Sequence, residues 1–520
     1  MKKLISILLA VVMMFTVATV AMAAVNYDQP FDRGTYGINE YRIPSLYTLN
    51  NGSVLAVADM RYDHGTDSPN NIDILAAISP NGYTNWNYTV LNHFDDYADG
   101  VTEAASASFI DSAIAQASSG RIFVVTDAQP AGCGYLKCER GTGFIDVDGK
   151  SYMLLTKGDS TDAPDTFNYY IGEFVDGFAP VLKVADNSAT EYSVDEEFDI
   201  YENGVALTMA QRGSEDATVK QNVFYADAVL KCFCTTYLWM RYSDDNGATW
   251  SAPVNLTGQV KMHSEYFLGI SPGRGVVTTL PDGTERIIFM VYDNGNLGWN
   301  EFENVSTIYS DDNGVTWNRG AETTPSVAVG KTSEGQIVDL GNGTLRMFAH
   351  NKGTHIAYAD STDYGVTWST FVSDENLVAM GNCMCSFINT SKKIDGKNVV
   401  LGSFPSNTRS RADGVIKVGL VEGTKPINWI STYKLTQNSF FAYSCLTELA
   451  DGNFAILYED EVSHIEYLVF SIDANGNISE INGNNPVSDD APEKELTVWE
   501  KIVKFFEDLF FKIGKFFGLA

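Results

Sequence analysis

The sequence predicts an all-β protein: a β-propeller that carries an inserted β-rich lobe and ends in a C-terminal amphipathic helix. Three observations support this fold class. A turn motif recurs along the chain, short apolar and β-branched runs lie between turn signals, and the recurrence stops for roughly a hundred residues in the first half.

The recurring motif has the form Ser-x-Asp-x-Gly-x-Thr-Trp. Clear copies occupy residues 243–250, 310–317 and 361–368, and two weaker copies lie at residues 79–86 and 471–476. In such a turn the Asp accepts backbone N–H groups, and the Gly adopts a positive φ that a Cβ would resist. The Thr and Trp then begin a strand, with the indole covering the turn.

The spacing of the copies indicates repeated sheets. The starts of the clear copies lie 67 and 51 residues apart, which suits one four-stranded sheet per propeller blade. Two other interpretations fit less well. An unrelated Asp-Asn-Gly turn would not end in Trp three times, and an EF-hand would need a later bidentate Glu that these loops lack.

The interruption of the motif predicts an insertion at residues 139–237. This segment is rich in Asp, Tyr and Phe and contains strand-like runs at residues 144–155 and 169–174. We therefore expect a small β-rich lobe near the rim of the site, inserted into a propeller that spans residues 26–478.

The C-terminal region changes its hydrophobic period. Residues 479–494 form a polar linker, and in residues 495–520 apolar side chains recur at helical spacing with lysines largely on the other face. This tail is too charged to cross a bilayer. It is predicted to be an amphipathic helix that packs on the propeller or on another copy, or that contacts a membrane or cell surface peripherally.

The N-terminus predicts export. Lys2 and Lys3 precede an apolar run that ends in Ala-Met-Ala at residues 21–23, so residues 1–23 have the pattern of a secretory signal peptide. A retained membrane anchor is the alternative. We expect a secreted, extracellular protein that could stay associated with the cell surface.

The cysteines do not predict a disulfide scaffold or a zinc site. Seven cysteines are an odd and sparse set for 520 residues. The pairs Cys232/Cys234 and Cys383/Cys385 have C-x-C spacing, which zinc sites do not use. Buried free thiols are the expected state.

The net charge restricts the partners. The formal charge of −31 argues against nucleic acid or an anionic membrane as the main partner. An acidic ligand is still possible, because salt screens the global field beyond about 8 Å and a few arginines can dominate locally. No cofactor is predicted, and no spacing of acidic residues identifies a metal or calcium site.

One further motif completes the pattern. Tyr-Arg-Ile-Pro at residues 41–44, together with the repeated turns, resembles the secreted bacterial sialidases (exo-α-sialidases or neuraminidases, glycoside hydrolase family 33) and their trans-sialidase relatives. The resemblance covers residues 30–475 and implies six blades. The insertion resembles that of large bacterial sialidases, including intramolecular trans-sialidases.

The resemblance implies three catalytic residues. Tyr443 matches the nucleophile, which is a neutral phenol because the substrate's own carboxylate would repel a carboxylate nucleophile. Glu334 matches the base that takes the phenol proton. Asp67 matches the acid/base that protonates the leaving oxygen and later activates water, and Asp63 is its nearest rival.

The resemblance also implies the binding residues. Arg42 and Arg411 match arginines that grip the substrate carboxylate, because a guanidinium is a planar fork of donors. Arg409 is a nearby rival of Arg411. Arg61 and Asp111 match residues that contact the sugar's hydroxyl and N-acetyl groups. Glu459 matches the carboxylate that braces the first arginine, Arg42.

One residue departs from the family pattern. His350 stands where a second arginine is expected, sixteen residues after Glu334. Strand alternation would place Arg346, His350 and Lys352 on one face. Histidine is mostly neutral at pH 7 and cannot form the bidentate fork. The clamp could therefore be weaker, acid-favoured, aided by Lys352, tuned to another ulosonic acid, or degraded.

The function implied by the resemblance is retaining hydrolysis of terminal α-linked sialic acid from sialylated glycans and glycoconjugates. The first alternative is an intramolecular trans-sialidase, which releases an anhydro-sialic acid because the sugar's own hydroxyl displaces the tyrosine. The second, favoured only by His350, is a non-catalytic propeller that binds sialoglycans. The full set at positions 67, 334 and 443 argues against a pure lectin.

Overall fold

A computed structural model describes residues 27–62, 64–101, 105–158, 167–295, 303–323, 329–341, 343–379 and 382–481. The predicted signal peptide, the C-terminal tail and the linker beyond residue 481 lie outside the described residues, as does Asp63.

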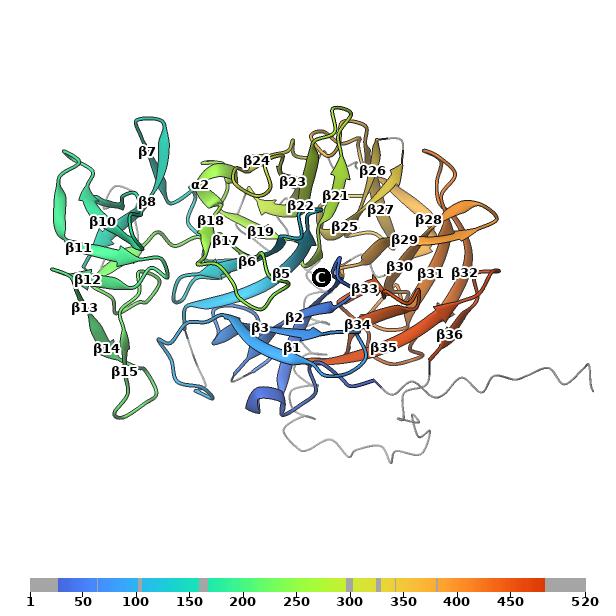
Figure 1. The fold of residues 1–520 in the computed structure, drawn as a ribbon, viewed down its shortest axis with the longest axis horizontal. Helices are drawn as coiled ribbons and strands as arrows, with labels where there is room; N and C mark the ends of the chain where they lie inside the picture. Colours follow the sequence, from blue (N-terminus) through green and yellow to red (C-terminus); the bar gives the residue numbers. More distant parts are fainter. Residues whose placement is uncertain are drawn as a thin grey trace, which may run out of the picture.

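Six sheets, antiparallel except for the short strand β20, are arranged around a common centre (Figure 1), which confirms the six-bladed all-β prediction. A 3₁₀ turn, Thr35–Gly37, precedes the first blade. That blade consists of β1 (Glu40–Thr48), β2 (Val54–Arg61), β3 (Ile72–Ser79) and β4 (Asn87–Asn92).

The second blade combines segments that are far apart in the chain. It contains β5 (Ser108–Gln116), β6 (Ile122–Gln129), β17 (Tyr237–Ser243) and β18 (Val254–Asn255), with β20 (Gly273–Arg274) added in parallel to β5. The short helix α2 (Thr257–Val260) follows β18.

The remaining blades follow in chain order. The third contains β19 (Phe267–Ile270), β21 (Val276–Thr279), β22 (Glu285–Asn294), β23 (Glu303–Ser310) and β24 (Asn318–Arg319). The fourth contains β25 (Thr332–Gly341), β26 (Thr344–Asn351), β27 (His355–Ser361) and β28 (Val372–Val378). The fifth contains β29 (Ser386–Ile394), β30 (Lys397–Pro405), β31 (Gly414–Leu420) and β32 (Asn428–Lys434). The sixth contains β33 (Ser444–Glu448), β34 (Phe454–Glu461), β35 (His464–Ile472) and β36 (Ile478–Glu480).

A β-rich lobe leaves the ring between β6 and β17 and stands at its side in Figure 1. Its main sheet contains β7 (Phe144–Val147), β8 (Lys150–Lys157), β9 (Tyr169–Ile171), β10 (Phe178–Lys183), β11 (Ala189–Asp195), β12 (Ile200–Glu202), β13 (Val205–Ala206) and β16 (Leu230–Cys232). A separate hairpin consists of β14 (Thr208–Ala210) and β15 (Thr218–Lys220).

The lobe and the second blade share one hydrophobic core. Phe224 of the lobe lies 5.1 Å from Trp239 on β17 and 5.2 Å from Phe94, ring centre to ring centre. All three belong to a single buried cluster that also contains Phe109 on β5. The lobe is therefore packed into the propeller rather than tethered to it.

The recurring motif occupies the same place in each blade that has it, between the third and fourth strands. In the copy after β23, Asp312 Oδ1 accepts the backbone N–H of Thr316 at 2.8 Å, and Gly314 has φ 85°. A Cβ on Gly314 would lie 2.3 Å from a ring carbon of Phe123 on β6. The glycine therefore lets the turn of one blade press against the preceding blade.

The ring closes without exchanging strands, since β1–β4 and β33–β36 form separate sheets. The first and last blades instead share a buried cluster that includes Leu46, Leu75, Cys445 and Leu457. Side-chain packing thus joins the two ends of the described chain.

The prediction about the thiols concerns the described residues, whereas the prediction about the tail at residues 495–520 lies outside them. No helix among them is long and apolar enough to span a membrane. All seven cysteines are free thiols, and six of them are buried as expected. Cys234 differs, because it is partly exposed.

Candidate active site

The predicted site residues gather at one rim of the ring because of strand pairing. The start of the first or innermost strand of a blade pairs with the end of its neighbour, as in Glu40↔Arg61, Thr332↔Asn351 and Ser444↔Tyr458. Residues near the start of β1, β25 and β33 therefore lie beside residues near the end of β2, β26 and β34. Arg42, Arg61, Glu334, His350 and Glu459 occupy these positions, and Tyr443 directly precedes β33.

Tyr443 and Glu334 form the centre of the site. The Tyr443 hydroxyl donates to Glu334 Oε2 at 2.5 Å, and both side chains are buried. Burial raises the pKa of the Tyr443 phenol well above its usual value, and the charge of Glu334 raises it further, while Arg411 opposes both. The phenol is thus protonated in the free protein and already directed at a carboxylate that can accept its proton.

Two guanidinium groups flank the phenol. The Cζ atoms of Arg42 and Arg411 lie 5.8 Å and 5.3 Å from the centre of the Tyr443 ring. Arg411 also donates to the carbonyl oxygen of Asn382 at 3.4 Å. The rival Arg409 lies in the preceding turn, where its backbone N–H donates to the side chain of Asn407.

Glu459 contacts Arg42, the arginine that the resemblance pairs with it. The carboxylate is fully buried and accepts Arg42 Nε at 3.1 Å and the backbone N–H of Ile43 at 3.1 Å. Ile43 has φ 56°, a left-handed conformation that a β-branched residue rarely adopts, at a bulge between β1 and β2. The left-handed backbone at Ile43 therefore directs the Arg42 guanidinium and the Ile43 N–H to the same carboxylate, that of Glu459 in the last blade.

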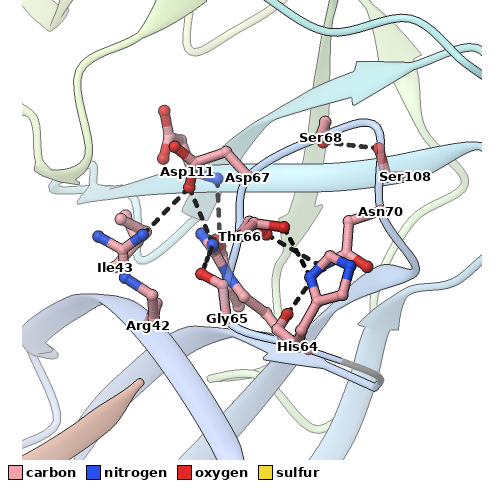
Figure 2. Close-up of polar contacts among 12 residues, drawn as sticks. Arg42, Ile43, His64, Gly65, Thr66, Asp67, Ser68, Asn70, Ser108 and Asp111 are labelled. Atoms are coloured by element: carbon pink, nitrogen blue, oxygen red, sulfur yellow. Dashed lines mark hydrogen bonds and ion pairs between the residues drawn. The ribbon is translucent and has the colours of Figure 1, made fainter. Parts of the chain in front are cut away.

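Asp67 lies on the loop after β2, as Figure 2 shows. Its Oδ1 accepts Arg61 Nη1 at 2.8 Å and Arg42 Nη1 at 3.1 Å, and its side chain is 65% exposed. Burial of part of the group would raise the pKa of Asp67, but Arg61 and Arg42 outweigh this effect and lower it. The carboxylate is thus ionised in the free protein and bound to an arginine of the predicted clamp.

Internal hydrogen bonds shape the Asp67 loop. Asn70 Nδ2 donates to the carbonyl oxygens of His64 at 2.8 Å and Thr66 at 2.9 Å. The Ser68 hydroxyl lies 2.7 Å from that of Ser108, which joins the loop to β5. These contacts hold the loop in the arch drawn in Figure 2.

Asp111 is buried and lies within strand β5, not in a connection between strands. It has φ 58° at a bulge against β6, and its backbone N–H donates to Asp59 Oδ1 at 3.1 Å. Burial raises the pKa of Asp111 well above its usual value, as do the charges of Glu334 and Asp59. The Tyr292 hydroxyl lies 3.5 Å from its Oδ2.

Sequence reasoning missed Asp59 and Tyr292. Asp59 is fully buried, accepts Arg61 Nη2 at 2.8 Å and so fixes the fully buried Arg61. Its position two residues before Arg61 places both on one strand face, a signal that could have identified it. Tyr292 lies on another blade, and nothing in its local sequence connects it to Asp111.

His350 contacts the predicted base. Its Nε2 lies 3.1 Å from Glu334 Oε2, the same oxygen that accepts the Tyr443 hydroxyl. Arg346, predicted to share its face, pairs instead with Asp360 at 2.6 Å and 2.7 Å. His350, which stands where an arginine was expected, therefore shares a carboxylate oxygen of Glu334 with Tyr443.

Two groups of side chains in the described part of the chain come close enough to hold a metal ion. One consists of Asp460, His464 and Glu466, and the other of Glu265, Asp293 and Glu322. Arg319 Nη2 forms ion pairs with Glu265 at 3.0 Å and with Asp293 at 3.2 Å. The second group therefore already contains a positive charge that neutralises its carboxylates. The residues of the candidate active site belong to neither group.

Most of the chain is similar in sequence to known proteins. A BNR repeat-like domain matches residues 219–456. The anhydrosialidase of Macrobdella decora is 33% identical over 455 residues, which cover 81% of this chain and 58% of that protein. Sialidase B of Streptococcus pneumoniae is 30% identical over 452 residues, which cover 81% and 61%. The chain thus spans about three fifths of the length of these two relatives.

Solved structures extend the comparison. The intramolecular trans-sialidase of Ruminococcus gnavus, in complex with oseltamivir carboxylate, is 33% identical and has a TM-score of 0.76, with 85% of this chain and 96% of that one covered. The leech intramolecular trans-sialidase, complexed with 2,7-anhydro-Neu5Ac, is 31% identical with a TM-score of 0.77, and the match covers 86% and 71%.

The fold is that of a sialidase-type six-bladed propeller. The chain belongs to the bacterial sialidase family, of the glycoside hydrolase family 33 type.

Proposed function

We propose that this protein is a retaining glycosidase that releases terminal α-linked sialic acid from glycoconjugates. The observation that carries the proposal is the hydrogen bond from the Tyr443 hydroxyl to Glu334, flanked by Arg42 and Arg411. A buried phenol paired with a carboxylate and set between two cations suits attack on a sugar that is itself an acid.

Binding begins with the substrate carboxylate. Arg42 and Arg411 hold it by charge-assisted hydrogen bonds. Arg42 Nη1 is bound to Asp67 in the free protein, so the incoming carboxylate competes with Asp67 for that donor. When Arg42 turns to the substrate, Asp67 loses one of the three arginines that lower its pKa. Substrate binding therefore raises the pKa of Asp67 and favours its protonated form, which can act as the acid.

The first chemical step forms a covalent intermediate. Glu334 takes the phenol proton as the Tyr443 oxygen attacks the anomeric carbon. Asp67, which takes up a proton from solvent when substrate binds, gives that proton to the leaving oxygen. The low dielectric around the buried pair strengthens the hydrogen bond between Tyr443 and Glu334 and so holds the phenol aligned for the transfer. A second displacement on the opposite side then restores the original anomeric configuration.

The second displacement distinguishes two candidate functions. In a hydrolase, Asp67 activates water, which releases free sialic acid. In an intramolecular trans-sialidase, a hydroxyl of the same sugar displaces Tyr443 and an anhydro-sialic acid leaves. The names of the anhydrosialidase and of the two solved relatives favour this second candidate.

A fluorogenic α-sialoside tests the cleavage step. We expect the purified protein to release the fluorophore and Tyr443→Phe to lose at least about 10³-fold in kcat, because the phenyl ring cannot attack. Equal rates for Tyr443→Phe and the wild type would refute the proposed nucleophile. Binding of a sialoside without turnover by the wild type would indicate the non-catalytic alternative.

Proton NMR of the products identifies the release route. Incubation with sialyllactose yields free sialic acid if water attacks, and a bicyclic anhydro-sugar if the sugar's own hydroxyl attacks. Each spectrum excludes the other route as the main one.

A further inference from the structure

A cluster of three thiols lies where the chain enters and leaves the lobe. Cys133 and Cys138 follow β6 on the outgoing connection, and Cys234 lies between β16 and β17 on the returning one. The backbone N–H of Glu139 donates to the carbonyl oxygen of Cys234 at 2.7 Å. The two connections are therefore side by side at the base of the lobe.

The thiols are close enough to react with one another. Cys133 Sγ lies 3.8 Å from Cys138 Sγ and makes a second side-chain contact with Cys234. Cys133 and Cys138 are buried, whereas Cys234 is partly exposed. Cys133 thus stands between a buried thiol and one that solvent can reach.

A buried lysine favours a thiolate at Cys138, whereas hydrogen bonds to Cys138 and Cys234 raise the pKa of the Cys133 thiol well above its usual value. Lys261 Nζ donates to the carbonyl oxygen of Tyr266 at 2.7 Å and to the Thr235 hydroxyl. A hydrogen bond from Cys133 lowers the pKa of the Cys138 thiol against the effect of burial, and the charge of Lys261 lowers it further. A thiol beside a cation is the usual setting of a reactive cysteine.

We propose that Cys133 and Cys138 are a dithiol that can be oxidised to a disulfide. Cys234 is the thiol that first reacts with a small-molecule disulfide. The resulting Cys133–Cys138 disulfide stiffens the turn that packs against the Asp67 loop.

The chemistry balances with a small-molecule disulfide as the oxidant. The Cys234 thiolate attacks it, forms a mixed disulfide and releases one thiolate. Cys133 then attacks Cys234 Sγ and releases the second small thiol, and Cys138 attacks Cys133 Sγ, which returns Cys234 to the thiol. Two protein thiols lose two protons and two electrons, and the reagent becomes two thiols. The last bond needs the sulfurs to approach from 3.8 Å to about 2.05 Å.

The turn between the two cysteines packs against the predicted acid/base loop. Gly134, next to Cys133, approaches the loop so closely that a Cβ there would lie 2.4 Å from the carbonyl oxygen of Ser68. Ser68 follows Asp67 directly. The same turn is anchored on its other side by Tyr135, whose ring lies 5.0 Å from that of Phe267. A cross-link in this turn therefore supports the backbone that carries Asp67.

Peptide mapping of the wild type under non-reducing conditions tests the dithiol. After incubation with oxidised glutathione, the free thiols of the denatured chain should fall from seven to five, with one Cys133–Cys138 cross-link. Seven remaining thiols, or a cross-link confined to Cys383 and Cys385, would overturn the proposal. This readout needs no sialidase activity, so its failure is separate from failure of the proposed function.

Variants test the order of the steps. Cys234→Ser should slow formation of the cross-link several-fold, with Cys445→Ser as a control for losing a buried thiol elsewhere. Cys138→Ser should trap a Cys133–Cys234 disulfide. An unchanged rate in Cys234→Ser would overturn the entry role of Cys234.

Hydrogen exchange tests the coupling to the loop. Amides in residues 64–70 should exchange more slowly in the oxidised wild type than in the reduced wild type, and Cys133→Ala/Cys138→Ala should show no such difference. Equal exchange in both wild-type states would overturn the proposed support of the Asp67 loop.

Discussion

At the residue scale, His350 is the most informative departure from the family pattern. Its imidazole shares Glu334 Oε2 with the Tyr443 hydroxyl, so it contacts the predicted base. An imidazole cannot form the bidentate fork of a guanidinium. The predicted clamp therefore depends chiefly on Arg42 and Arg411.

His350→Arg should tighten binding of a sialic-acid-like inhibitor near neutral pH. A charge-assisted hydrogen bond contributes about 1.5–3 kcal/mol, so we expect roughly a tenfold or greater fall in Kd by calorimetry. His355→Arg, on the neighbouring strand β27, is the matched control. Unchanged or weaker binding would show that residue 350 does not stand in the clamp.

Asp67→Asn should affect substrates according to their leaving groups. An amide cannot give a proton to the leaving oxygen, so we expect kcat on sialyllactose to fall about 10²–10⁴-fold. An aryl sialoside with an acidic phenol needs little protonation and should lose much less. Equal losses on both substrates would contradict the acid role of Asp67.

The same residue predicts a pH dependence of stability. The folded-state pKa of Asp67 is lowered, so its ion pairs stabilise the fold above the unfolded value of about 3.9 and cease to do so as pH falls through the folded pKa. Because the side chain is largely exposed, the effect is at most about 1 kcal/mol.

Urea unfolding of the wild type and Asp67→Asn measures this effect. The gap between their free energies of unfolding should be present at pH 7 and shrink below about pH 4. The exposed Asp216→Asn serves as the control. A gap that grows at low pH would contradict the assignment.

At the element scale, the recurring turn does more than connect two strands. In the copy after β23, Gly314 combines a left-handed φ with direct contact between its backbone and Phe123 of the preceding blade. The motif thus specifies both the turn and the interface between blades. This explains why its glycine recurs even where the other residues of the motif vary.

Gly314→Ala should separate these two roles when compared with Gly283→Ala. Both glycines have positive φ, but a Cβ on Gly283 would meet open space. We expect Gly283→Ala to cost about 1 kcal/mol and Gly314→Ala about 1–3 kcal/mol more, because Phe123 is buried and cannot give way. Equal losses in denaturant unfolding would contradict packing between the blades.

At the scale of the whole molecule, the lobe and the ring should unfold together. Phe224 inserts from the lobe among Phe94, Tyr237 and Trp239 of the ring. Phe224→Ala should cost about 3–5 kcal/mol. Phe178→Ala, on an exposed face of the lobe, should cost less than about 1 kcal/mol.

Tryptophan fluorescence and far-UV circular dichroism, followed in the same denaturant titration, check the cooperativity. A single coincident transition is expected for the wild type. Two separated transitions, with Phe224→Ala affecting only the first, would show that the lobe is an independent unit.

The sequence predicted the architecture through repetition. The turns marked blades because their spacing and their Trp residues are local features, and the gap at residues 139–237 marked the lobe. The reactive residues came from a resemblance, and the structure brings them to one rim. Their roles, and the limits of the domains, stay predictions.

The contacts between distant segments could not be predicted. The left-handed backbone at Ile43 and Asp111 depends on bulges against neighbouring strands, which no local pattern encodes. The contact of His350 with Glu334 and that of Tyr292 with Asp111 join separate strands. Such pairs depend on tertiary geometry rather than on composition.

The contact between the first and last blades, which closes the ring, has a consequence for biosynthesis. Arg42 is made early, yet its buried partner Glu459 and the nearby Tyr443 belong to the last blade. A growing polypeptide on the ribosome therefore lacks Glu459 and Tyr443 until nearly all of it has been translated. Any shortened product that ends before the sixth blade would be without the proposed nucleophile, however well its other five blades fold.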